Sequence, residues 1–121
     1  MSRRRKLMDK LEELRLRYLH SLPQKAADVR AQLQRLQQQP DERALLVELH
    51  QQVHRLSGSA PAYGFDAIGA LARPIDQRLS EWLRNDDPEI RTAAAVLVAT
   101  LSGPVDALAE ALASAADSPP G

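Results

Sequence analysis

Apolar residues recur at every third or fourth position along most of this chain, and that spacing gathers them on one face of an α-helix. Leu and Ala supply most of these positions, whereas aromatic residues make up only 3% of the chain. No stretch of useful length alternates with the period of two residues expected of a strand. The sequence therefore predicts an all-α protein, with helical segments at about residues 5–20, 23–39, 42–60, 67–82 and 88–112.

Short connections between these segments predict an antiparallel, up-down four-helix bundle with an additional short helix at its N-terminus. Ser21 and Gln24 form the pattern of a capping box around Pro23, which indicates that a new helix starts there. We expect residues 1–113 to form a single domain around one hydrophobic core. Residues 114–121 are small, polar or proline and have no apolar stripe, so we expect them to be a disordered tail.

Proline also occurs inside two of the later segments, at Pro74 and at the Gly103-Pro104 pair. The apolar stripe keeps its phase on both sides of each interruption, so we expect a kink there rather than the end of a helix. Tyr63 and Trp82 fall at positions where helices pack, which favours a structural role for both rings.

Charge and composition exclude several classes of protein. Basic and acidic residues balance over the whole chain, and the basic run Arg3 to Lys6 has no second cluster beside it, so it indicates a solvated end and makes nucleic acid an unlikely partner. The chain has no cysteine, which excludes disulfides and cysteine-based zinc sites. The longest apolar run, residues 93–99, is too short to cross a bilayer, so we expect a cytoplasmic protein that does not bind membranes.

One exposed histidine stands out from the rest of the sequence. His54 lies about 130° around its helix from the apolar stripe, so its side chain should face water. Gly58 follows one turn later on the same side, although glycine inside a helix costs about 0.5–1 kcal/mol relative to alanine. A gap beside the imidazole would let a partner reach it. From spacing alone, a nucleophilic histidine and an ordinary surface histidine are equally compatible with the pattern.

One run of this sequence resembles the signature of bacterial histidine phosphotransfer (HPt) domains. The run is His54-Arg55-Leu56-Ser57-Gly58-Ser59-Ala60, followed by Gly64-Phe65. The likeness extends over about residues 8–112. It implies that His54 is a phosphoacceptor, which takes a phosphoryl group from a receiver-domain aspartate and passes it to another response regulator. It also implies a phosphocarrier without kinase activity that binds no cofactor, with Mg²⁺ on the receiver and a hybrid sensor histidine kinase upstream.

The resemblance assigns further residues around the histidine. Three of them would support the phosphoryl site, namely Ser57, Gly58 and Ser59, and five would contact the partner, namely His50, Gln51, Arg55, Pro61 and Gly64. The family usually has lysine three residues after the histidine, and Ser57 brings no charge to that position. An alternative is therefore a catalytically silent bundle that binds a receiver or a histidine kinase stoichiometrically, as an adaptor or inhibitor.

His50 and His54 also have the i, i+4 spacing that can place two imidazoles on one metal ion. No third ligand is evident at a matching position, and Gln51 stands where a helical metalloprotease motif needs glutamate. The sequence therefore predicts no metal site.

Overall fold

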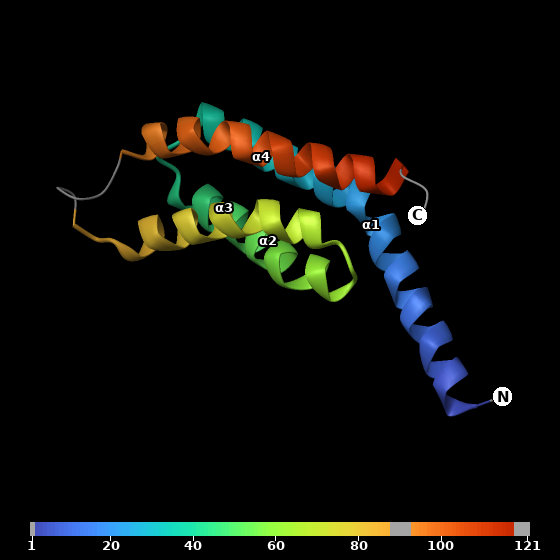
Figure 1. Cartoon of the computed structure of the whole chain (residues 1–121). Helices are drawn as coiled ribbons and strands as arrows, with labels where there is room; N and C mark the ends of the chain where they lie inside the picture. Colours follow the sequence, from blue (N-terminus) through green and yellow to red (C-terminus); the bar gives the residue numbers. More distant parts are fainter. Residues whose placement is uncertain (1, 88–92, 118–121) are drawn as a thin grey trace.

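The computed structural model describes residues 2–87 and 93–117, and all regular structure within them is α-helical. Helix α1 packs mainly against α4, and α2 against α3, while contacts between α1 and α2 and between α3 and α4 close the ring of neighbours (Figure 1). This arrangement confirms the prediction of an all-α four-helix bundle. The helices are α1 (Arg3–Gln38), α2 (Arg43–Ala62), α3 (Asp66–Arg84) and α4 (Ala94–Asp117).

The core is formed by one apolar stripe from each helix, as the periodicity predicts. Each buried leucine or isoleucine contributes about 1.5–3 kcal/mol by leaving water, so these stripes hold the four helices together. Trp82 is half-buried against the edge of this core. The fully buried side chains include Leu22 and Leu36 from α1, Leu46 and Leu49 from α2, Ile75 and Leu79 from α3, and Leu108 and Leu112 from α4.

The separate N-terminal helix was a wrong prediction, because α1 continues through Pro23 as one helix of 36 residues. The Ser21 hydroxyl donates to the Tyr18 carbonyl at 2.6 Å, so it does not cap a new helix. Leu22 and Ala26 are both buried on the same face on either side of Pro23. Burial of that continuous stripe outweighs the hydrogen bond that proline cannot donate.

The N-terminal third of α1 extends beyond the other helices and has no helix beside it (Figure 1). Leu7, Met8 and Leu11 are therefore exposed, although they continue the helical stripe. The helix starts with a cap, in which the Ser2 side chain accepts a hydrogen bond from the Arg5 backbone amide.

Helix α4 begins at Ala94 and continues to Asp117, past the boundary at residue 113 that the sequence suggested. Alanines of the last turns, including Ala113 and Ala115, pack against the core. This packing and the high helix propensity of alanine favour continuation of the helix beyond residue 113. The expected start at residue 88 falls within residues 88–92, which lie outside the described residues, as do residues 118–121.

By length and composition, α4 is the one helix in the described part of the chain that could cross a membrane. Its leucines, together with Val98 and Val105, form a stripe that is buried against the other helices of the bundle. The charged side chains Asp106 and Glu110 lie on its exposed face. This division between an apolar and a polar face is that of a core helix in a bundle.

The turn between α2 and α3 fixes how these two helices face each other. Gly64 has a φ of +89°, in the left-handed region that favours glycine. The Gly64 amide donates to the Pro61 carbonyl, and the Phe65 amide donates to the Ala60 carbonyl at 2.8 Å, which is the Schellman pattern of a helix C-terminus. Gly64, which the resemblance assigned to partner contact, therefore has a structural role in the turn that aligns α3 with α2.

Candidate functional site

His54 lies on the outer face of α2, with 68% of its side chain exposed, while its neighbour Val53 is completely buried. This confirms the prediction that the ring faces water. Gly58 lies one turn later, and a Cβ built at this glycine would meet no atom within 4 Å. The expected gap beside the imidazole is therefore present.

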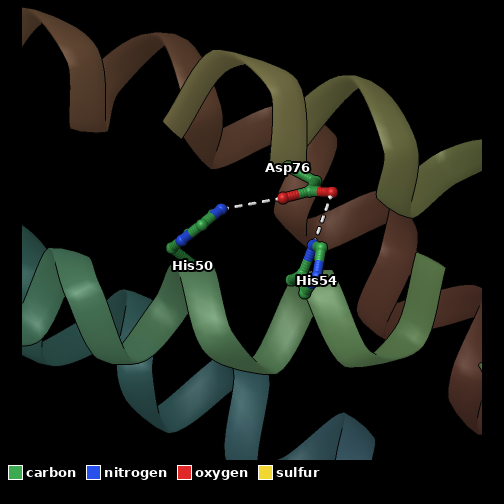
Figure 2. A group of neighbouring side chains, drawn as sticks. All are labelled: His50, His54 and Asp76. Atoms are coloured by element: carbon green, nitrogen blue, oxygen red, sulfur yellow. Dashed lines mark hydrogen bonds and ion pairs between the residues drawn. The ribbon is translucent and has the colours of Figure 1, made fainter. Parts of the chain in front are cut away.

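A carboxylate from the neighbouring helix contacts this ring. Asp76 of α3 lies between the two histidines of α2, with Oδ2 3.1 Å from His54 Nδ1 and Oδ1 2.8 Å from His50 Nε2 (Figure 2). Only 16% of the Asp76 side chain is exposed, so the carboxylate is held between the two helices. One aspartate thus binds both imidazoles, each through a different oxygen.

These contacts determine which nitrogen of His54 carries the proton. A carboxylate oxygen accepts but does not donate, so His54 Nδ1 must donate to Asp76. The neutral ring then keeps its lone pair on Nε2, and no group within the described residues forms a hydrogen bond to that atom. The unprotonated nitrogen is therefore available as a nucleophile.

Asp76 was not among the residues singled out from the sequence. It follows the core residue Ile75, so its position at the edge of the α3 stripe could be anticipated from periodicity. Its place opposite His54 could not, because the register between two helices depends on the turn that joins them.

His50 belongs to the same cluster rather than to the free surface. Only 25% of its side chain is exposed, and its ring lies 5.7 Å from that of His54, centroid to centroid. The structure also supplies the third potential ligand that was not evident in the sequence. His50 Nε2, His54 Nδ1 and a carboxylate oxygen of Asp76 all lie within 4.8 Å of one another.

Ser57 follows His54 by three residues on α2 and contacts both the His54 backbone and Asp76. Its hydroxyl donates to the His54 carbonyl at 2.8 Å, and it also lies 3.4 Å from Asp76 Oδ2. The single hydroxyl proton is therefore used inside the protein, so Ser57 provides neither a charge nor a free donor at the position where the resemblance leads one to expect lysine.

Ser59 points away from the histidine and toward α1. Its hydroxyl lies 2.7 Å from that of Tyr18, whose ring stacks on Tyr63 at 4.6 Å. This contact gives Ser59 a role in packing rather than a place beside the phosphoryl site. Burial raises the pKa of Tyr18 above its usual value and the nearby Tyr63 raises it further, while the hydrogen bond with Ser59 acts in the opposite direction.

The other residues expected to contact a partner lie around this site. Gln51 is exposed on α2, close to the two histidines in sequence. Arg55 is also exposed, but it lines a different depression, between α2 and α1, together with Lys25. Pro61 packs against Gly69 of α3, so it holds the two helices together.

A shallow depression of about 200 Å³ runs from the histidine cluster along α3. Arg84 is its one permanently cationic residue among the described residues, and Asp76 and Glu81 both contribute negative charge. The depression is therefore open and slightly negative when the histidines are counted as neutral. Its lining residues are His50, His54, Asp76, Gln77, Ser80, Glu81 and Arg84.

Comparison with protein families matches residues 13–117 to the Hpt domain. The match includes nearly the whole bundle and both partners of the His54–Asp76 contact, and it leaves out the start of α1, which extends from the bundle. Comparisons with curated proteins and with solved structures gave no match. Since the family covers most of the sequence, the chain belongs to the Hpt domain family.

Proposed function

We propose that this chain is a cytoplasmic phosphocarrier in which His54 accepts a phosphoryl group from a receiver-domain aspartate and passes it to another response regulator. Hpt domains are phosphocarriers that exchange phosphoryl groups with receiver domains in phosphorelays, and the chain belongs to that family. The observation that carries the proposal is the state of the His54 ring, which is 68% exposed and bound to Asp76 through Nδ1.

The transfer follows from this hydrogen bond. Nε2 of the neutral ring attacks phosphorus, so an Nε2–P bond forms while the bond from phosphorus to the receiver's carboxylate oxygen breaks. The proton stays on Nδ1, and the positive charge that develops on the ring is balanced by Asp76 at 3.1 Å. In the onward step the protonated ring is a good leaving group, so the same contact assists both directions.

The surface around His54 is suited to a partner that supplies the positive charge needed for phosphoryl transfer. The open space at Gly58 lets a receiver approach the ring, and exposed Gln51 lies on the same helix. Phosphoryl transfer depends on positioning and on nearby positive charge. We expect the receiver to supply Mg²⁺ and a lysine, and Arg84 is the cation that this chain offers in the depression next to His54.

One observation favours the alternative of a silent bundle. Ser57 occupies the position of the usual lysine, and its hydroxyl is bonded to the His54 carbonyl. The chain would then dock on a receiver or a histidine kinase without accepting phosphate, and would inhibit it by occupancy.

The test is transfer of labelled phosphate from a panel of phosphorylated receivers to the purified chain. The wild type should acquire acid-labile phosphate, His54→Gln should acquire none, and His20→Gln, at an exposed histidine of α1, should behave as the wild type. Asp76→Asn keeps an acceptor oxygen but removes the negative charge from a hydrogen bond worth about 1.5–3 kcal/mol, so transfer should slow by up to about 100-fold. Label on His54→Gln would refute the assignment, and stoichiometric binding without label would establish the silent bundle.

A further inference from the structure

We propose that His50, His54 and Asp76 form a binding site for a divalent transition metal ion such as Zn²⁺, and that the bound ion withdraws His54 from phosphoryl transfer. The first half revises the expectation from the sequence that the chain binds no metal. It rests on the geometry of the three side chains alone. The second half rests on the proposed function.

The three ligand atoms are already close to the arrangement that zinc requires. His50 Nε2, His54 Nδ1 and an Asp76 oxygen lie within 4.8 Å of one another. Zinc bonds of about 2.0–2.2 Å to nitrogen and oxygen in a tetrahedron place ligand atoms about 3.4 Å apart. Both rings direct these nitrogens at the Asp76 carboxylate, each at a different oxygen (Figure 2), and an ion would replace these two hydrogen bonds.

The backbone holds these ligands in place. His50 and His54 lie one turn apart on the same face of α2, and Asp76 comes from α3, which packs closely on α2. Each ligand is next to a fully buried residue, namely Leu49, Val53 and Ile75 respectively, so the core fixes the position of all three. Ligands on rigid helices lose little conformational freedom when the ion binds.

The chemistry of the ligands selects the ion. Two imidazoles and one carboxylate match zinc and other borderline divalent ions, whereas Mg²⁺ prefers an all-oxygen site. The Mg²⁺ needed by a receiver therefore would not fill this site. The depression beside the cluster is open, so water can complete the coordination.

Metal binding and nucleophilic attack need opposite tautomers of His54. The nucleophilic ring carries its proton on Nδ1, which donates to Asp76, and has a lone pair on Nε2. An ion at Nδ1 takes the lone pair of that nitrogen, so the proton must move through solvent to Nε2. The atom that would attack phosphorus is then protonated. A bound ion thus blocks transfer even though the ring remains exposed.

Titration with Zn²⁺ alone, followed by calorimetry, tests the site directly. We expect one ion per chain, at least tenfold weaker binding for His50→Gln, His54→Gln and Asp76→Asn, and unchanged binding for His20→Gln. Circular dichroism would verify that each variant folds. Nitrogen NMR of the wild type provides a second readout that needs no substitution, because the His54 signal should change from the Nδ1–H to the Nε2–H tautomer. No stoichiometric binding, or equal binding by the three variants, would overturn the site.

Labelled transfer with and without Zn²⁺ tests the second half, with each variant compared with its own zinc-free rate. Wild-type transfer should fall at least tenfold at saturating zinc, and the receiver's own dephosphorylation without this chain controls for zinc acting on the partner. A zinc-loaded chain that accepts phosphate at the full rate would overturn the regulatory half and leave the site standing. A chain that binds zinc but accepts no phosphate without it would refute the proposed function, and the regulatory half with it.

Discussion

The contact between Gly69 of α3 and Pro61 of α2 sets the distance between the two helices that carry the site. Gly69 is buried, and a Cβ at this position would lie 2.4 Å from Pro61 Cγ and 2.9 Å from Cδ. The proline ring is tied to its own backbone and cannot rotate away. Replacing Gly69 with alanine must therefore push α3 away from α2.

The size of the effect is a balance of two contributions. Alanine is favoured over glycine inside a helix by about 0.5–1 kcal/mol. Overpacking a closely packed contact costs about 1–3 kcal/mol. We therefore expect Gly69→Ala to lower the free energy of unfolding by about 1 kcal/mol, and by about 2.5 kcal/mol at most. The matched control is Gly58→Ala, where a Cβ meets no atom within 4 Å, so only the helix preference remains and stability should rise by about 0.5–1 kcal/mol.

Urea denaturation followed by far-ultraviolet circular dichroism measures both variants. The two substitutions are chemically identical and both lie inside helices, so a difference in sign isolates the contact with Pro61. Because Asp76 lies two turns after Gly69 on α3, the displacement should also weaken its contact with His54 and slow labelled transfer. A Gly69→Ala protein as stable as Gly58→Ala would refute the claim that this contact fixes the helix spacing.

Two other substitutions test the core and the contact between α1 and α2. Leu46→Ala should lower the free energy of unfolding by about 2–5 kcal/mol in urea denaturation, because this side chain is fully buried, and a loss below about 1 kcal/mol would contradict its place in the core. The raised pKa of Tyr18 means that the folded chain holds the phenolic proton more tightly than the unfolded chain does. Its contribution to stability is thus complete below the unfolded pKa of about 10 and is lost as pH rises through the folded pKa. Tyr18→Phe should remove this loss in denaturation at alkaline pH, whereas an unchanged alkaline decline would refute it.

Local periodicity predicted the features of this protein that depend on one helix at a time. The exposure of His54 and the gap at Gly58 follow from their angle to the buried stripe, and both are present. Pro74 lies inside a single helix, as the unbroken phase of its stripe suggested. The same argument applied to Pro23, but the capping pattern around it favoured a break. Burial of Leu22 in the bundle keeps the helix continuous through Pro23. A local capping pattern cannot reveal such tertiary packing.

Features that depend on the packing of two helices could not be predicted from the periodicity of the sequence. Asp76 meets His54 because the Schellman turn at Gly64 and the contact between Gly69 and Pro61 set the register of α3 against α2. Each of these residues is visible in the sequence, but the pairing is a property of the assembled hairpin.

Ser57 links the two proposed properties of the site, because a cation at this position acts on them in opposite directions. The Ser57 hydroxyl lies 3.4 Å from Asp76 Oδ2, so the ammonium group of a Ser57→Lys chain could reach both Asp76 and a phosphoryl group on His54. It should lengthen the lifetime of phosphorylated His54 by adding a charge-assisted contact. It should also weaken zinc binding by about tenfold, since it repels the ion and competes for its carboxylate ligand. Phosphate release and zinc titration on one protein preparation measure both effects, and a Ser57→Lys chain that binds zinc as tightly as the wild type would show that Asp76 is not a ligand.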